Sequence, residues 1–116
     1  MSDCLFCKIV KGEIPSKKAY EDDKILVFHD IAPCAPVHLL AIPKAHIKSA
    51  AEIDQGNAEV IAHLFTSMAK IAKESGLYDG FRIVTNCGKQ GGQTVDHLHF
   101  HLLGGRNLGA LLTESE

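Results

Sequence analysis

The sequence predicts an α+β fold in which a five-stranded antiparallel sheet packs against one long helix and a short N-terminal helix. Five short segments have the apolar content of strands, and one longer stretch repeats its apolar residues every three or four positions. Strands and helices do not alternate along the chain, which disfavours a doubly wound parallel sheet. With 116 residues, 46% of them hydrophobic, the chain is predicted to form one domain, residues 1–116, with a buried core.

The first predicted elements are a helical turn and a hairpin. Residues 4–11 form the turn, which Gly12 and Pro15 stop. Residues 19–21 and 25–29 read as two strands, because both are apolar or aromatic and two aspartates between them favour a tight turn. A loop that two prolines hold extended follows this hairpin.

The middle of the chain predicts a buried strand and then an amphipathic helix. Residues 38–42 form an almost continuous apolar run, which indicates a strand covered on both faces. Residues 49–52 have the spacing of a capping box. From about residue 54 or 57 to residue 75, apolar side chains line one helix face, and Gly76 ends the helix. His63 falls on the opposite face and is expected to be solvated.

Two more strands, at 81–86 and from 96 or 97 to 103, complete the predicted sheet. In the last strand, His97, His99 and His101 alternate with apolar residues. Side chains in a strand point to opposite faces with period two, so the imidazoles would share one face, roughly 6–7 Å apart. The apolar residues between them would fill the core. Three groups that titrate near neutral pH suit phosphate chemistry or a metal.

A glycine-rich loop, residues 86–94, leads into the histidine strand. Glycines let backbone N–H groups approach an anion closely, and Gln93 and Thr94 add side-chain donors. A phosphate bound there would lie over the imidazoles, where one ring nitrogen can attack phosphorus. The same glycines could instead form a wide hairpin turn. Asp30, at the end of a strand, could accept hydrogen bonds from a ribose diol or cap a turn.

Cys4-Leu5-Phe6-Cys7 is a second chemical motif. It is typical of half a zinc site, although a pair of buried small hydrophobes or a redox motif would have the same spacing. No βαβ unit leads into it, which disfavours the redox reading. The spacing leaves the other two ligands open among the histidines at positions 29, 38, 46 and 63 and the row at 97–101.

The composition disfavours several other classes of protein. A net charge of −2 gives no general attraction to nucleic acid. No apolar run reaches the length of a membrane span, and the N-terminus lacks the pattern of a secretory signal. We therefore expect a cytoplasmic protein with no membrane partner, whose four cysteines are reduced.

The segment His97-Leu98-His99-Phe100-His101-Leu102-Leu103 resembles the signature of the histidine-triad (HIT) superfamily. Five further segments resemble its HINT-like branch, the histidine-triad nucleotide-binding proteins: Phe28-His29-Asp30-Ile31, Ala35-Pro36-Val37-His38, Ile42-Pro43-Lys44, Gly91-Gly92-Gln93-Thr94 and Leu103-Gly104-Gly105-Arg106. The resemblance covers residues 4–108. It implies a purine nucleoside phosphoramidase that hydrolyses the P–N bond of adenosine 5′-monophosphoramidates and related AMP adducts.

The resemblance also implies roles for single residues. His99 would be the nucleophile, flanked by His97 and His101, with His38 supporting His101 and Thr94 helping to protonate the leaving group. The residues implied in nucleotide binding are Asn86, Gly92 and Gln93 at the phosphate, Asp30 at the ribose, and Phe6, His29 and Ile31 at the purine, together with Thr94, His99 and His101 from the catalytic group.

For the metal, the resemblance to members that carry zinc implies a structural Zn²⁺ held by Cys4, Cys7, His46 and His97, with no metal required at the reacting phosphate. It further implies a homodimer with a continuous ten-stranded sheet. The tail from Leu108 to Glu116 lacks the Trp-Pro-Pro-Gly type ending of many relatives, so the preferred leaving group is open.

Three alternatives to the phosphoramidase come from other classes of function. They are a dinucleoside polyphosphate hydrolase, a non-catalytic purine-nucleotide-binding protein and a purely structural zinc protein. The loop at 92–94 and the segment at 103–106 favour the phosphoramidase over the dinucleotide hydrolase, and the intact histidine triad disfavours the non-catalytic reading.

Overall fold

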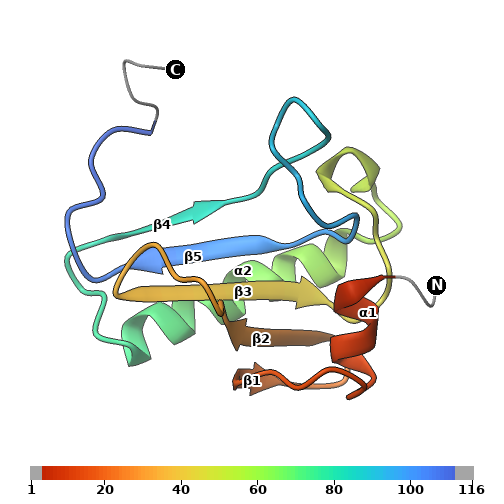
Figure 1. Cartoon of the computed structure of the whole chain (residues 1–116), viewed down its shortest axis with the longest axis horizontal. Helices are drawn as coiled ribbons and strands as arrows, with labels where there is room; N and C mark the ends of the chain where they lie inside the picture. Colours follow the sequence, from red (N-terminus) through yellow and green to blue (C-terminus); the bar gives the residue numbers. More distant parts are fainter. Residues whose placement is uncertain (1–3, 112–116) are drawn as a thin grey trace.

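The computed structural model describes residues 4–111 and has the predicted α+β architecture, a five-stranded antiparallel sheet with helices on both faces (Figure 1). The strands are β1 (Lys18–Glu21), β2 (Ile25–His29), β3 (Val37–Pro43), β4 (Phe81–Val84) and β5 (Phe100–Gly104), in the spatial order β1-β2-β3-β5-β4. The helices are α1 (Leu5–Val10), the short 3₁₀ helix η1 (Ala50–Glu52) and α2 (Ala58–Glu74). None of these helices is long and apolar enough to cross a membrane.

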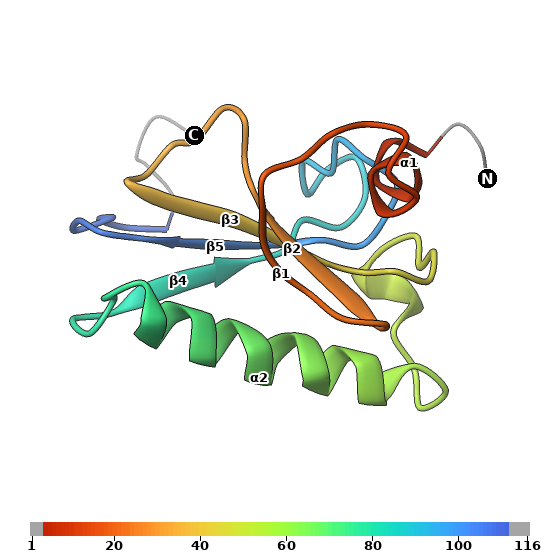
Figure 2. The ribbon, with the colours of Figure 1, turned by 90° about the horizontal axis from the view of Figure 1, so that it is seen from below.

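The long helix α2 runs along one face of the sheet, and α1 lies on the other side, as the view turned by 90° shows (Figure 2). Leu64 and Met68 of α2 are fully buried against the face formed by residues such as Leu39 and Leu102. On the opposite face, Phe6 of α1 packs with a separate apolar cluster from β2 and β3. The central strand β3 is therefore covered on both faces, as its apolar run predicts.

The last strand is shorter than predicted, because it begins at Phe100 instead of residue 96 or 97. The residues before Phe100 direct their backbone groups away from the sheet. The amide of Leu98 donates to the carbonyl of Ile47 at 2.6 Å, and the carbonyl of His99 accepts from the Thr85 hydroxyl at 2.8 Å. His97 and His99 therefore lie in the segment that leads into β5, where contacts with other parts of the chain replace strand pairing.

Three other predicted boundaries also move. Strand β4 ends at Val84 instead of residue 86, and α2 spans residues 58–74. The capping-box segment forms η1, in which the Ser49 hydroxyl accepts from the amide of Ala51 at 3.2 Å. A separate turn after η1 precedes α2, so the capping box starts a short helix of its own.

His63 is partly exposed, as expected from its helix face, but it also has a partner that the sequence did not predict. Its Nε2 atom lies 2.6 Å from Oδ2 of Asp22, and its side chain is 39% exposed. Asp22 also accepts from the amides of Lys24 and Ile25 and from the Tyr20 hydroxyl. The turn between β1 and β2 is thus tied to the middle of α2, a long-range contact that helix periodicity alone does not reveal.

Candidate active site and metal cluster

The register of β3 against β5 places His38 beside His101. Leu40 pairs with His101 and His38 with Leu103, so all four side chains share the face that carries α1. Nε2 of His38 lies 2.9 Å from Nδ1 of His101. On the other face, Phe100 and Leu102 enter the core under α2, which confirms the predicted alternation within this strand.

His99 has a defined tautomer. Its Nδ1 lies 2.8 Å from the main-chain carbonyl of His97, which can only accept, so Nδ1 carries the proton and Nε2 has the free lone pair. The ring is 4% exposed and contacts Phe6 edge-on, with ring centroids 5.0 Å apart. The ring of His101 lies on another side, at a centroid distance of 5.2 Å. A neutral imidazole with an available Nε2 is a competent nucleophile.

The tautomers of His38 and His101 follow from one backbone contact. The amide of Cys34 donates to Nδ1 of His38 at 3.1 Å, so the proton of a neutral His38 is on Nε2. That N–H donates to Nδ1 of His101, which places the proton of a neutral His101 on its own Nε2. Burial lowers the pKa of His101, and the nearby His99 and His38 lower it further, so His101 favours this neutral form.

Asp30 contacts the same histidine pair. Its Oδ1 accepts from the amide of Ala32 at 2.8 Å, and its Oδ2 lies 3.3 Å from Nε2 of His38. The cap of a turn, one of the two predicted uses of Asp30, is therefore present, and ribose binding stays a prediction. Of the residues expected at a purine, Phe6 is buried, whereas His29 is exposed and Ile31 is 99% exposed.

The glycine-rich loop is held by Gln93. Its side-chain amide nitrogen donates to the carbonyls of Lys48 and Val95, and its amide oxygen accepts from the amide of Gly88. Gly92 has a φ of +83°, a conformation that favours glycine. Both hydrogens of the Gln93 amide are thus engaged within the protein, while Thr94 is exposed. Phosphate binding by this loop, including Asn86 and Gly92, stays a prediction.

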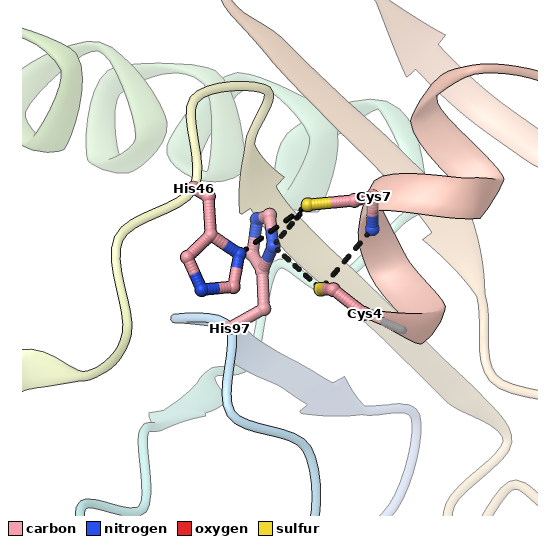
Figure 3. A group of neighbouring side chains, drawn as sticks. All are labelled: Cys4, Cys7, His46 and His97. Carbon is pink, nitrogen blue, oxygen red and sulfur yellow. Dashed lines mark hydrogen bonds between the residues drawn. The ribbon is translucent and has the colours of Figure 1, made fainter. Parts of the chain in front are cut away.

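The second group of residues brings Cys4, Cys7, His46 and His97 together at the start of α1 (Figure 3). Their four ligand-type atoms lie within 4.8 Å of one another. Nδ1 of His97 is 3.3 Å from Sγ of Cys4 and 3.5 Å from Sγ of Cys7, and Nδ1 of His46 is 3.3 Å from Sγ of Cys7. The structure therefore assembles the four residues predicted to hold zinc.

The tautomer of His97 suits a metal ligand. Its Nε2 donates to the carbonyl of Pro43 at 2.9 Å, so the unprotonated Nδ1 faces the two sulfur atoms. Burial lowers the pKa of His97 and raises that of Cys7, where the Cys4 thiol adds to the effect. Two thiols and two imidazoles with converging lone pairs are the donor set of a closed structural zinc site.

Several contacts of this site have no clear signal in the sequence. The hydroxyl of Thr85 and the carbonyls of Pro43 and Ile47 hold the histidine segment, yet each belongs to an ordinary strand end or loop. Only the final sheet pairing reveals them. The predicted C-terminal tail begins at Leu108, and within it the carbonyl of Gly109 accepts a hydrogen bond from Arg82 of β4. Residues 112–116 of the tail lie outside the described part of the chain.

A histidine row, a histidine pair bonded across two strands and an antiparallel sheet with this strand order define a HIT-type domain. The family model described as "Scavenger mRNA decapping enzyme C-term binding" matches residues 3–112. An uncharacterized HIT-like protein of Synechococcus elongatus is 49% identical over 106 residues, covering 91% of this chain and 93% of that protein. Protein HitA of Neisseria gonorrhoeae is 46% identical over 104 residues, covering 90% and 97%. The chain belongs to the HIT superfamily.

Solved structures agree with this placement. A HIT family hydrolase from Clostridium thermocellum is 45% identical, with a TM-score of 0.92 and coverage of 97% of this chain and 99% of that one. A histidine triad protein from Clostridium difficile is 47% identical, with a TM-score of 0.91 and coverage of 97% and 98%. The shared fold thus extends over nearly the whole length of these chains.

Proposed function

We propose that this protein is a hydrolase of the HINT-like type that cleaves the P–N bond of adenosine 5′-monophosphoramidates and related AMP adducts. The observation that carries the proposal is the hydrogen bond from Nδ1 of His99 to the carbonyl of His97. This bond places the proton of a neutral His99 ring on Nδ1 and leaves Nε2 free to attack phosphorus. The similarity to a HIT family hydrolase over nearly the whole chain supports the same class of reaction.

The reaction would proceed in two displacements at phosphorus. Nε2 of His99 forms a bond to phosphorus as the P–N bond breaks, and the leaving amine takes up a proton from solvent, a transfer that Thr94 is expected to assist. Water then attacks phosphorus and gives up a proton to solvent, the bond to His99 breaks, and AMP is released with a neutral imidazole restored. Splitting the hydrolysis into two transfers makes each displacement easier. In this proposal, the Nε2–H of His101 would donate to the developing negative charge on the phosphoryl oxygens.

The test uses an AMP phosphoramidate of a fluorescent amine, with His99→Ala beside the wild type and diadenosine tetraphosphate in parallel. We expect the wild type alone to release the amine, and His99→Ala to retain AMP binding because the predicted phosphate and ribose contacts lie elsewhere. Turnover by His99→Ala would overturn the nucleophile. Cleavage of the dinucleotide alone would indicate a dinucleoside polyphosphate hydrolase, and cleavage of neither would favour a nucleotide-binding protein without catalysis.

We also propose a structural zinc ion held by Cys4, Cys7, His46 and His97. The support is the convergence of their sulfur and nitrogen atoms, with the proton of His97 turned away toward Pro43. A zinc ion bound there would link α1 to the segment that leads into the catalytic strand, and four protein ligands would leave no open position for substrate.

A homodimer is the third part of the proposal. Strand β4 lies at the edge of the sheet, and its first residue, Phe81, is 43% exposed. Pairing β4 of one chain with β4 of the other would give the predicted ten-stranded sheet and cover the β4 edge of each chain. The chain has a mass of 12.6 kDa, so size-exclusion chromatography with light scattering should report about twice this value; the mass of one chain would contradict the dimer.

A further inference from the structure

The loop between β2 and β3 makes three polar contacts with His38. The amide of Asp30 donates to the carbonyl of His38 at 3.0 Å, and the amide of Cys34 donates to its Nδ1 at 3.1 Å. The carboxylate of Asp30 lies 3.3 Å from the other ring nitrogen. The side chain of His38 is only 5% exposed, so this loop and His101 provide most of its polar surroundings.

The single N–H of the His38 ring is directed at His101, and the Asp30 carboxylate lies beside the same nitrogen. Nδ1 of His101 lies at 2.9 Å, and Oδ2 of Asp30 lies at 3.3 Å. The carboxylate is itself held in place, because its other oxygen accepts from the amide of Ala32 and its side chain is 18% exposed. A fixed negative charge beside Nε2 stabilises the tautomer that carries its proton there.

We propose that Asp30 is a positioning residue for the reaction, in addition to any contact with ribose. Acting through His38 and together with the amide of Cys34, it keeps Nδ1 of His101 unprotonated and the proton of His101 on Nε2, the nitrogen that His38 does not use. This inference rests on the proposed function, in which that N–H serves the reacting phosphoryl group. It extends the predicted role of Asp30 from binding the nucleoside to determining which ring nitrogen of His101 is protonated.

An Asn at position 30 tests the proposal with little change of shape. Its amide oxygen can still accept from the amide of Ala32, but its NH₂ group would face the N–H of His38. Two donors would then meet, which disfavours the present tautomer of His38 and with it that of His101. Asp30→Asn should therefore alter catalysis without removing the turn that Asp30 caps.

The kinetic experiment compares an adenosine phosphoramidate with its 2′,3′-dideoxy analogue. A residue that only binds ribose would change KM for the ribonucleoside substrate, and its replacement would have no effect on the analogue. We expect instead that Asp30→Asn lowers kcat roughly 10- to 100-fold on both substrates. An unchanged kcat on the dideoxy analogue would overturn the positioning role.

A second readout needs no turnover. In the free wild-type protein, ¹⁵N NMR of the imidazoles should show Nδ1 of both His38 and His101 unprotonated, and Asp30→Asn should shift these signals toward the other tautomer. Unchanged tautomers in Asp30→Asn would overturn the proposal. Failure of the wild type to cleave either substrate would instead remove the proposed function, while the NMR result would still decide the tautomer.

The chain supplies a matched control in Asp22. This aspartate also caps a turn through one oxygen and contacts the Nε2 of a histidine, His63, through the other. The pair lies at the turn between β1 and β2, against α2 and away from the triad. Asp22→Asn should leave kcat on both substrates and the tautomers of His38 and His101 unchanged, and equal effects of the two substitutions would contradict a specific role for Asp30.

Discussion

Two groups of ligand-type side chains lie along the histidine row. They differ in whether ring lone pairs or ring protons point toward the neighbouring side chains. In the group of Cys4, Cys7, His46 and His97, the unprotonated Nδ1 of His97 faces two sulfur atoms, and Nδ1 of His46 lies 3.3 Å from one of them. In the group of Asp30, His38 and His101, a proton lies between His38 and His101. The first arrangement favours a cation at its centre, whereas donors and acceptors already match in the second.

The cause of this difference lies outside the rings. The carbonyl of Pro43 takes the proton of His97, which turns its lone pair toward the thiols. The amide of Cys34 occupies the lone pair of His38, which turns its proton toward His101. A single backbone contact at each histidine thus distinguishes a candidate metal ligand, His97, from a histidine that donates its proton to another histidine, His38. Substitutions in the two groups should therefore have different effects, on metal content and stability in the first and on catalysis in the second.

The largest expected effect is loss of the metal cluster. Cys4→Ser combined with Cys7→Ser should abolish bound zinc and lower the thermal midpoint by more than about 10 °C, because metal binding is coupled to folding. Elemental analysis and thermal unfolding measure both quantities. Cys34→Ser combined with Cys87→Ser is the control, because both cysteines are exposed and outside the cluster. Wild type purified without chelator that holds less than about one-tenth equivalent of zinc would contradict the site.

Removing His38, which donates a hydrogen bond to His101, should affect catalysis more than folding. His38→Ala should lower kcat for the phosphoramidate about 10²- to 10⁴-fold, since His101 would lose the partner that sets its tautomer. His63→Ala removes a histidine from the other aspartate–histidine pair and should leave kcat within about twofold. Steady-state kinetics of the two variants would contradict the assignment if their kcat values were similar.

The partly exposed pair formed by Asp22 and His63 should contribute to the free energy of unfolding and not to catalysis. Burial alone would raise the pKa of Asp22, but hydrogen bonds from Tyr20, His63 and two backbone amides outweigh it and hold that pKa well below its usual range. The contribution is therefore present above the ordinary aspartate pKa and lost as the pH falls below it. Asp22→Asn should reduce the free energy of unfolding by about 1–3 kcal/mol at pH 7.

Urea unfolding of wild type and Asp22→Asn measures this difference. It should narrow as the pH is lowered below about 4, where the carboxyl group of the unfolded chain becomes protonated. A difference that stays constant from pH 7 to pH 3 would show that the charge of Asp22 does not contribute.

The smallest expected effect is the titration of His101. Burial, with smaller contributions from His99 and His38, lowers its pKa, so the folded protein binds this proton less readily than the unfolded chain. Stability should therefore fall as the pH drops through about 6.5, and His101→Gln should remove part of that dependence. NMR titration of the His101 ring checks the cause directly; a midpoint above the ordinary histidine value would contradict it.

Much of the fold could be predicted from local patterns. The apolar repeat identified α2, and the alternation after His97 correctly placed Phe100 and Leu102 in the core. The start of β5 could not be predicted, because the amide of Leu98 donates to the carbonyl of Ile47, which lies in a loop far earlier in the chain. The contact of His63 with Asp22 was missed for the same reason.

The candidate site divides in the same way. The amino-acid sequence predicts which chemical groups are present and, through its resemblance to the HIT superfamily, which four residues are candidate zinc ligands. The folded structure was needed to assign the protons of His38, His97, His99 and His101, because a tautomer depends on the partner of the other ring nitrogen. Those partners, the carbonyls of Pro43 and His97 and the amide of Cys34, are backbone groups that any residue type would offer. Their role comes from position, which folding alone supplies.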